Sequence, residues 1–258
     1  MILNKTRMNN TKKINYISEW IKNYVDAMEN PAESLIIGIS GGIDSALSST
    51  LSSMTGIKTI AISMPISTNQ NQSNLGGIHG KWLTDKFINS TYINIDLTDS
   101  YKIFHSKLTD MEQLSELGFA NSKARLRMMT LYQVASSQNG IVVGTGNKVE
   151  DFGVGFYTKY GDGGVDISPI ADLMKSEVKE LSKTLEIDSR IIHAEPTDGL
   201  WDDDRTDEKQ LGLSYDELEE AMINSNSMNR EKYESIRKNN IHKMNPIPVC
   251  ILPKDNLE

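Results

Sequence analysis

The sequence predicts an α/β fold, a doubly wound parallel sheet with helices on both faces, in a single domain over residues 1–258. Three observations predict this fold. Short apolar runs of strand length recur as far as Gly144, helical patterns separate them, and a glycine-rich turn follows the first run. Parallel strands require long crossover connections, and because such crossovers are right-handed, the helices come to lie on both faces of the sheet.

The first expected element is an amphipathic helix. Its apolar residues recur at steps of three and four from Ile14 to Met28, and it should end before Pro31. Four apolar runs then predict buried strands at residues 34–40, 57–64, 91–95 and 141–144. Helical patterns lie between them at residues 44–54, about 71–87 and 120–137.

The pattern changes after residue 145. Residues 145–166 are rich in glycine and show no clear period. Further helices are expected at about 174–185, 214–224 and 229–242. The polar and acidic stretch 194–210 predicts a mobile loop.

Composition and charge exclude several classes of protein. The formal charge is −8, which argues against a nonspecific nucleic-acid binder, and nine acidic and two basic residues between Trp201 and Glu220 account for most of it. No apolar run approaches the roughly 20 residues of a membrane span, and the first residues lack a secretory signal, so a cytoplasmic protein without membrane partners is expected. Cys250 stands alone and the four histidines are isolated, so neither a disulfide nor a structural zinc site is expected.

The strongest chemical signal directly follows the first expected strand. Residues 40–45 read SGGIDS, and the two glycines let the backbone turn tightly and approach a ligand. The helix that follows points free N–H groups at this turn, which suits phosphate. The carboxylate of Asp44 beside phosphates makes chemical sense with Mg²⁺ between them. A structural alternative is a simple Ser/Gly turn with Asp44 in the first helical turn.

Two other stretches imitate known motifs. Residues 144–146 read GTG after a strand, but Val149 occupies the position of the third glycine in a dinucleotide-binding fingerprint. The acidic stretch from Asp202 imitates a calcium loop, but Asp207 and Leu213 stand where Gly and Glu are required.

Several segments together resemble the NAD+ synthetase family, a branch of the adenine-nucleotide alpha-hydrolase superfamily. They occur in the family's order over most of the chain: GISGGIDS at 38–45, NSKARLRM at 121–128, GTGNKVE at 144–150, FYTKYGDGGVDISPI at 156–170, Lys175 at a helix start, EPTDGLW at 195–201, TDEKQLGLSYDEL at 206–218, and His242-Lys243. The segments at 121–128 and 156–170 are the most specific, because other branches of the superfamily lack them.

The resemblance implies a reaction and an adenine-nucleotide alpha-hydrolase-like fold. Family members use ATP to convert deamido-NAD and ammonia into NAD, AMP and diphosphate, through an adenylated nicotinate carboxylate. Members that use glutamine carry an extra amidase domain with a catalytic cysteine. This chain has neither that length nor a suitable cysteine, so it is expected to use free ammonia or ammonia delivered by another protein.

The resemblance also implies the site residues. Contacts to ATP are expected from Gly38, Ile39, Ser40, Gly41, Gly42, Ile43, Asp44, Ser45, Thr145, Lys175 and Thr197. Contacts to deamido-NAD are expected from Arg125, Lys159, Asp166, His242 and Lys243. Mg²⁺ is expected on Asp44 and Glu150, and Asp44, Lys175 and Asp166 are the expected catalytic residues. The family implies a homodimer with the deamido-NAD site at the contact.

Some features depart from the family or leave alternatives open. The spacing between Glu150 and Lys159 is about one residue longer than in well-known bacterial members, and the tail after Lys243 matches nothing. Taken alone, Glu150 is also typical of a solvated acid and Lys159 of a surface lysine. Two other functions remain as rivals: another adenylating ligase, such as a tRNA-modifying or GMP-forming enzyme, and a non-catalytic adenine-nucleotide sensor.

Overall fold

The structure, a computed structural model, describes residues 8–66, 75–109, 111, 114–197, 199–201 and 205–252. Its centre is a parallel four-stranded sheet in the order β3-β2-β1-β4. The strands are β1 (Ser34–Gly38), β2 (Lys58–Ser63), β3 (Ser90–Asn94) and β4 (Gly140–Val142). All three pairings are parallel, which confirms the doubly wound prediction.

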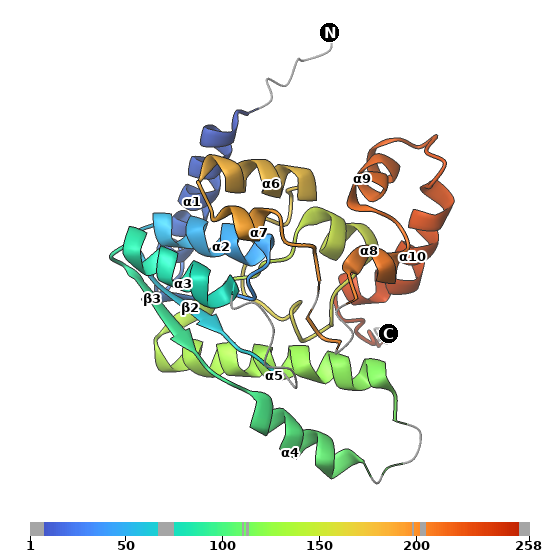
Figure 1. The fold of residues 1–258 in the computed structure, drawn as a ribbon, viewed down its shortest axis with the longest axis horizontal. Coiled ribbons are helices and arrows are strands. Elements are labelled where there is room, and N and C mark those ends of the chain that lie inside the picture. The colour runs from blue at the N-terminus through green and yellow to red at the C-terminus, as the bar shows by residue number, and fades with distance from the viewer. Residues whose placement is uncertain are drawn as a thin grey trace, which may run out of the picture.

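Helices cover both faces of the sheet (Figure 1). One face carries α1 (Asn10–Asp26), α2 (Ile43–Met54), α3 (Leu75–Lys86), α6 (Lys175–Thr184) and α7 (Ser189–Ile192). The other face carries α4 (Thr98–Leu108) and α5 (Glu116–Ser137). Among the described residues, no helix combines the length and the apolar character that a bilayer crossing requires.

Alternation along the strands explains the two layers. In β1, Leu35 and Ile37 are fully buried against the helices of the first face, whereas Ile36 points into the core beneath α5. Side chains of a strand point alternately to opposite faces, so a run of apolar residues without polar interruption is what a sheet buried on both sides needs.

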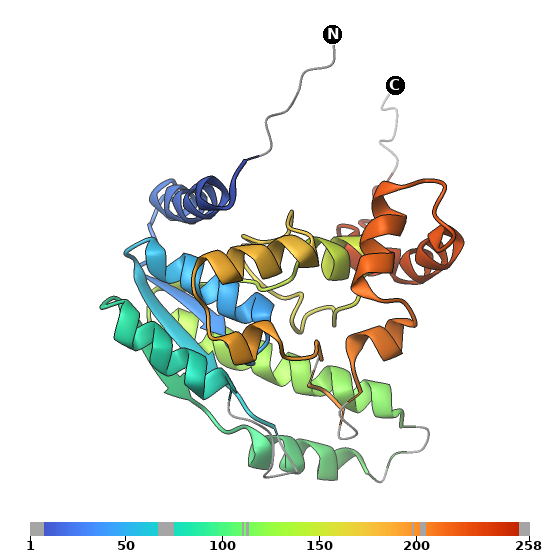
Figure 2. The same ribbon diagram turned by 45° about the horizontal axis from the view of Figure 1, so that its top comes forward.

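A third core lies beside the sheet and joins the C-terminal helices to the middle of the chain (Figure 2). A π-helix, η1 (Lys148–Val154), packs here against α8 (Asp207–Leu211), α9 (Tyr215–Ile223) and α10 (Arg230–Met244). Val149 and Val154 of η1 are fully buried against Leu218 of α9. The C-terminal helices therefore rest directly on the segment that carries Glu150.

Most predicted elements are confirmed, with corrections at particular places. The stretch 145–166, which has no clear period in the sequence, contains η1. The expected loop at 194–210 ends in α8, because the Thr206 side chain caps that helix. The helix α4 was not expected, and the helix expected from residue 71 begins at Leu75, residues 71–74 lying outside the described part of the chain.

Candidate active site

The two carboxylates expected to hold Mg²⁺ meet where the strand order reverses. The chain runs outward from β1 through β2 to β3, and then places β4 on the other side of β1. The segments that follow β1 and β4 leave the sheet at the same edge, and they diverge there to form the crevice in which doubly wound proteins bind ligands. Asp44 follows β1 and Glu150 follows β4.

The turn after β1 is held in shape by its own serines. The Ser45 hydroxyl donates to the Gly42 carbonyl at 2.9 Å and accepts from the Ser40 backbone N–H at 3.3 Å. The Ser40 hydroxyl accepts from the Gly42 N–H at 3.1 Å. Gly42 is the N-cap of α2 without a side-chain cap, so the first N–H groups of this helix point toward the turn, as an anion site requires.

Gly41 is required in this turn for two reasons. Its φ of 92° lies in the region that L-residues with side chains rarely adopt. A Cβ atom at this position would also lie 2.6 Å from the Cβ of Leu75 and 2.8 Å from the backbone nitrogen of Gly76. The start of α3 therefore packs directly on the turn and fixes its path.

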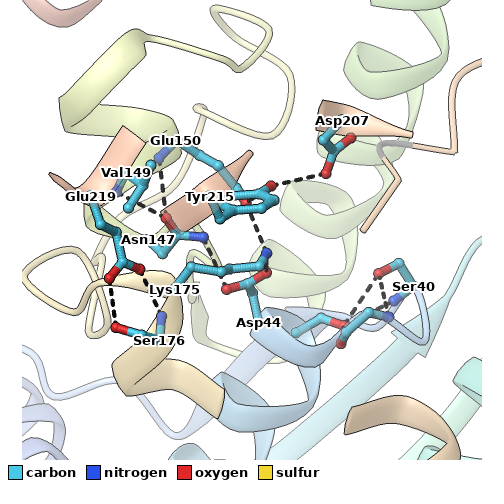
Figure 3. Close-up of polar contacts among 12 residues, drawn as sticks. Ser40, Asp44, Asn147, Val149, Glu150, Lys175, Ser176, Asp207, Tyr215 and Glu219 are labelled. Carbon is cyan, nitrogen blue, oxygen red and sulfur yellow. Dashed lines mark hydrogen bonds and ion pairs between the residues drawn. The ribbon is translucent and has the colours of Figure 1, made fainter. Parts of the chain in front are cut away.

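Asp44, Glu150 and Lys175 converge on one point (Figure 3). The Lys175 ammonium lies 2.5 Å from Oδ2 of Asp44 and 2.8 Å from Oε1 of Glu150. Lys175 is the first residue of α6, and its side chain is almost wholly buried. Three segments far apart in the sequence thus place two carboxylates around one lysine ammonium.

Burial and charge set the protonation of this cluster. Burial alone would lower the pKa of Lys175, but the carboxylates of Asp44 and Glu150 raise it above its ordinary value, so the side chain is an ammonium. Burial would likewise raise the pKa of Glu150, yet the charge of Lys175 lowers it. Burial raises the pKa of Asp44, and repulsion from Glu150 adds to that effect.

Asn147 and Tyr215 complete the cluster, and sequence reasoning missed both. The fully buried Asn147 donates from Nδ2 to Oδ1 of Asp44 at 3.0 Å and accepts from the backbone N–H groups of Val149 and Glu150. Tyr215 donates its hydroxyl to Oε1 of Glu150 at 2.5 Å. Asparagine is a common N-cap, but no helix was expected after Asn147, and nothing in the sequence pattern indicates that Tyr215 reaches the site.

The expected pyridine-nucleotide residues form a second group. Arg125 of α5 donates from Nε to the Lys159 carbonyl at 3.3 Å, so these two residues lie together. Lys243 of α10 donates to the Tyr157 carbonyl at 2.8 Å. The structure therefore brings α5, α10 and the 157–159 segment to one side of the crevice.

Asp166 is held by the sheet itself. One of its carboxylate oxygens accepts from the Tyr132 hydroxyl at 3.0 Å and the other from the Val142 backbone N–H at 2.7 Å. Both oxygens thus stabilise the end of β4. Its expected roles in catalysis and in binding deamido-NAD stay predictions.

Three expected residues lie apart from the charge cluster. Thr145 follows β4 at the crevice edge, and His242 is exposed near the end of α10. The hydroxyl of Thr197 donates to the Arg205 carbonyl at 3.2 Å. Their contacts with ligands also stay predictions.

Two acids that the sequence reasoning did not select lie near Glu150 and Lys243. Burial raises the pKa of the half-buried Asp151 well above its ordinary value, and the neighbouring charge of Asp162, an exposed residue, raises it further. The amine of Lys243 lies near both, and burial lowers its pKa. This side of the site is therefore acidic, and not uniformly basic as a simple dinucleotide cleft would be.

The donor set fits a divalent cation shared with a nucleotide. No group of three or more metal-ligating side chains occurs among the described residues. Mg²⁺ is commonly held by one or two carboxylates together with substrate phosphates. Asp44 and Glu150 lie close enough together to bind the same cation, the Lys175 ammonium, beside the phosphate-binding turn. The site thus suits a metal that arrives with its nucleotide.

Comparison with known proteins gives consistent matches. The family model described as NAD synthase matches residues 13–250. An NH3-dependent NAD+ synthetase from Methanosarcina acetivorans is 39% identical over 215 residues, which cover 82% of this chain and 80% of that protein. Among solved structures, an NMN synthetase from Francisella tularensis superposes with a TM-score of 0.81 at 30% identity, over 95% of this chain and 99% of the other. An NH3-dependent NAD synthetase from Campylobacter jejuni shares the fold, with a TM-score of 0.74 at 24% identity over 95% of this chain and 100% of the other.

Proposed function

The chain belongs to the NAD synthase family, and from that membership we propose that it amidates deamido-NAD to NAD with ammonia and ATP. The observation that carries this proposal is the convergence of Asp44, Glu150 and Lys175 beside the phosphate-binding turn. The reaction is an amide-forming ligation and the last step of NAD biosynthesis.

The chemistry explains why ATP is needed. A carboxylate does not form an amide directly, because oxide or hydroxide would have to leave. The nicotinate carboxylate instead attacks the α-phosphorus of ATP, the bond to the β-phosphate bridge breaks, and diphosphate leaves. Ammonia then attacks the carbonyl carbon of the acyl adenylate, the bond to the adenylate oxygen breaks, and AMP leaves. The attacking nitrogen loses a proton, which ends in solvent.

The chain contributes mainly charge and alignment to these steps. The N–H groups at the start of α2 would bind the triphosphate. The Lys175 ammonium, once it leaves Asp44 and Glu150, would compensate charge that develops on the leaving diphosphate. Arg125, Lys159 and Lys243 lie where they can align the pyridine nucleotide. No nucleophilic side chain is needed, because both bond-forming atoms belong to substrates.

We further propose Mg²⁺ as the cofactor. Asp44 and Glu150 would hold it, with oxygens of the ATP phosphates completing its ligands. When bound, the ion supplies positive charge that polarises the phosphates and stabilises the departing diphosphate. Loading of the ion with ATP would require the Lys175 ammonium to leave its position between the two carboxylates.

We also propose that the working unit is a homodimer in the cytoplasm. None of the residues of α4 is buried, and Ile103 and Phe104 of this helix are exposed. On the adjoining α5, Leu117 and Met129 are exposed as well. A second copy of the chain is the proposed cover of this apolar face, and the cytoplasm is where ATP and ammonia are available together.

An assay of purified protein tests the function directly. Protein, ATP, Mg²⁺, deamido-NAD and ammonium should yield NAD and AMP in equal amounts. A different adenylating ligase would leave deamido-NAD unchanged, and a nucleotide sensor would form neither product. Either result would overturn the proposal.

The likeness to an NMN synthetase supports an alternative candidate for the pyridine substrate, nicotinate mononucleotide. The same amidation on nicotinate mononucleotide would yield NMN, and that structure matches this chain over nearly its whole length. Comparing kcat/KM for deamido-NAD and for nicotinate mononucleotide decides between the two. A larger value for deamido-NAD is expected from the family's NAD synthetases, and a larger value for the mononucleotide would assign the chain to NMN synthesis.

A further inference from the structure

Tyr215 links the charge cluster to the C-terminal helices. It is the first residue of α9 and is buried in the third core, between η1 and α8. Its hydroxyl lies 2.5 Å from Oε1 of Glu150 and 3.1 Å from Oδ2 of Asp207, and Figure 3 shows it between these two side chains. Asp207 is the first residue of α8.

The ring of Tyr215 makes a second contact with the cluster. The Lys175 ammonium lies 4.7 Å from the ring centroid, within the range of a cation–π attraction. One side chain therefore touches both the carboxylate and the cation at the centre of the site. Tyr215 belongs to α9, which begins more than sixty residues after Glu150 in the sequence.

The orientation of Glu150 depends on this hydroxyl. The bonds from Lys175 and from Tyr215 both end on the same carboxylate oxygen, Oε1. If Lys175 turns toward a bound nucleotide, the bond from Tyr215 still holds this oxygen in place.

We propose that Tyr215 is a positioning residue of the amidation site, which orients the Glu150 carboxylate for the metal–nucleotide complex and ties it to Asp207 of α8. This inference rests on the proposed function, because it assigns a residue to that same site. Nucleotide binding then requires α8 and α9 to be packed against η1, although neither helix covers the doubly wound sheet.

The test uses Tyr215→Phe, which removes the hydroxyl and keeps the ring. Tyr233→Phe is the matched control, because Tyr233 is buried in the same third core but has no contact with the charge cluster. Calorimetric titration with Mg²⁺ and α,β-methylene ATP measures binding without turnover. Tyr215→Phe should weaken binding by about 10-fold, as expected for the loss of a hydrogen bond to a charged group, and Tyr233→Phe should bind like the wild type.

Steady-state kinetics separates positioning from a general loss of structure. The Mg²⁺ concentration for half-maximal rate should rise about 10-fold in Tyr215→Phe, while KM for deamido-NAD stays within about twofold. A wild-type Mg²⁺ dependence and wild-type binding in a folded variant would overturn the proposal, and so would an equal effect of Tyr233→Phe.

A double-mutant cycle tests the link to α8. Asp207→Asn alone and together with Tyr215→Phe should give effects on nucleotide binding that are not additive, because the two residues act on Glu150 in series. Full additivity would remove Asp207 from the proposal. If the wild-type protein binds the nucleotide but forms no NAD, the proposed function fails, while the binding comparison still decides the role of Tyr215.

Discussion

At the scale of single residues, the site depends on negative charge at two positions that share one cation. Asp44 receives bonds from Lys175 and from Asn147, so each of its oxygens has a fixed partner. Replacing this carboxylate by an amide keeps the shape but removes the charge that Lys175 and a divalent cation require.

We therefore expect Asp44→Asn to lower kcat by at least ~100-fold, equivalent to about 2.7 kcal/mol of barrier. Asp172→Asn is the matched control, because Asp172 forms an exposed ion pair with Lys148 at 2.7 Å away from the cluster. Steady-state assays of both variants check this prediction. Near-wild-type turnover of Asp44→Asn would show that the charge of Asp44 is not needed.

The site shows which residues can be found from sequence and which cannot. Asp44, Glu150 and Lys175 lie in motifs that the sequence displays, and the structure brings them together. Asn147 and Tyr215 lie within the family-like segments 144–150 and 206–218, but their contacts with Asp44 and Glu150 form only on folding, and the residue pattern does not indicate those contacts. Tyr215 reads as an ordinary apolar residue of an amphipathic helix, since its ring is indeed in a core.

At the scale of elements, a buried histidine joins the two helices that flank the phosphate-binding turn, α2 and α3. His79 of α3 is fully buried, and its Nε2 lies 2.9 Å from the Ser49 hydroxyl of α2. Burial lowers the pKa of His79 to about 4. In the unfolded chain the pKa of a histidine is near 6.5. Between pH 6.5 and pH 4, His79 is therefore protonated in the unfolded chain but neutral in the folded protein, and this difference favours unfolding.

Stability should therefore fall as pH drops from 6.5 toward 4. The wild type should lose about 2 kcal/mol of unfolding free energy between pH 7 and pH 5 through this residue. Urea unfolding of His79→Gln should show a smaller loss over the same interval, and His193→Gln, at an exposed position, should match the wild type. Equal pH dependence in all three proteins would contradict the prediction.

The π-helix η1 carries Glu150 in its first turn, directly after the N-cap Asn147. The helix ends at Gly155, with φ of 68°. A Cβ atom there would lie 2.7 Å from the Cβ of Asn240 and 2.7 Å from the Cε of Met244, both on α10.

Gly155→Ala should consequently destabilise the protein by two effects, the unfavourable positive φ and the clash with α10. A Gly→Ala change at a positive φ without a clash should destabilise it less. Gly56→Ala is the control, because its φ of 79° is similar and no atom lies within 4 Å of the added Cβ. We expect Gly56→Ala to cost about 1 kcal/mol and Gly155→Ala at least about 1 kcal/mol more. Denaturant unfolding measures both, and equal losses would show that α10 does not restrict this turn.

Elements were predictable where periodicity or caps are strong. The four strands and most helices follow from apolar spacing, whereas α4 does not. None of its residues is fully buried, and Tyr101 packs only partly buried against the core beneath α5. The π-helix was missed for a different reason. Its seven residues fit neither the period of an α-helix nor that of a strand, so the sequence shows no regular pattern.

At the scale of the whole molecule, the exposed apolar face of α4 and α5 predicts self-association. Light scattering after gel filtration should give twice the 28.8 kDa chain mass for the wild type. Phe104→Asp should shift the protein toward the monomer, because it places a charge within the apolar face. Ile88→Asp, at a fully exposed position outside that face, should leave the mass unchanged. A monomeric wild type would contradict the proposed dimer.

The proposed mechanism predicts that one carboxylate oxygen of the pyridine substrate ends in AMP, through a reaction in the crevice between the ends of β1 and β4. The direct measurement uses deamido-NAD labelled with ¹⁸O in its carboxylate, together with ATP, Mg²⁺ and ammonium. Mass spectrometry should find one labelled oxygen in each AMP and none in the diphosphate, because the acyl adenylate breaks between carbon and that oxygen. Unlabelled AMP, or label in the diphosphate, would contradict the account.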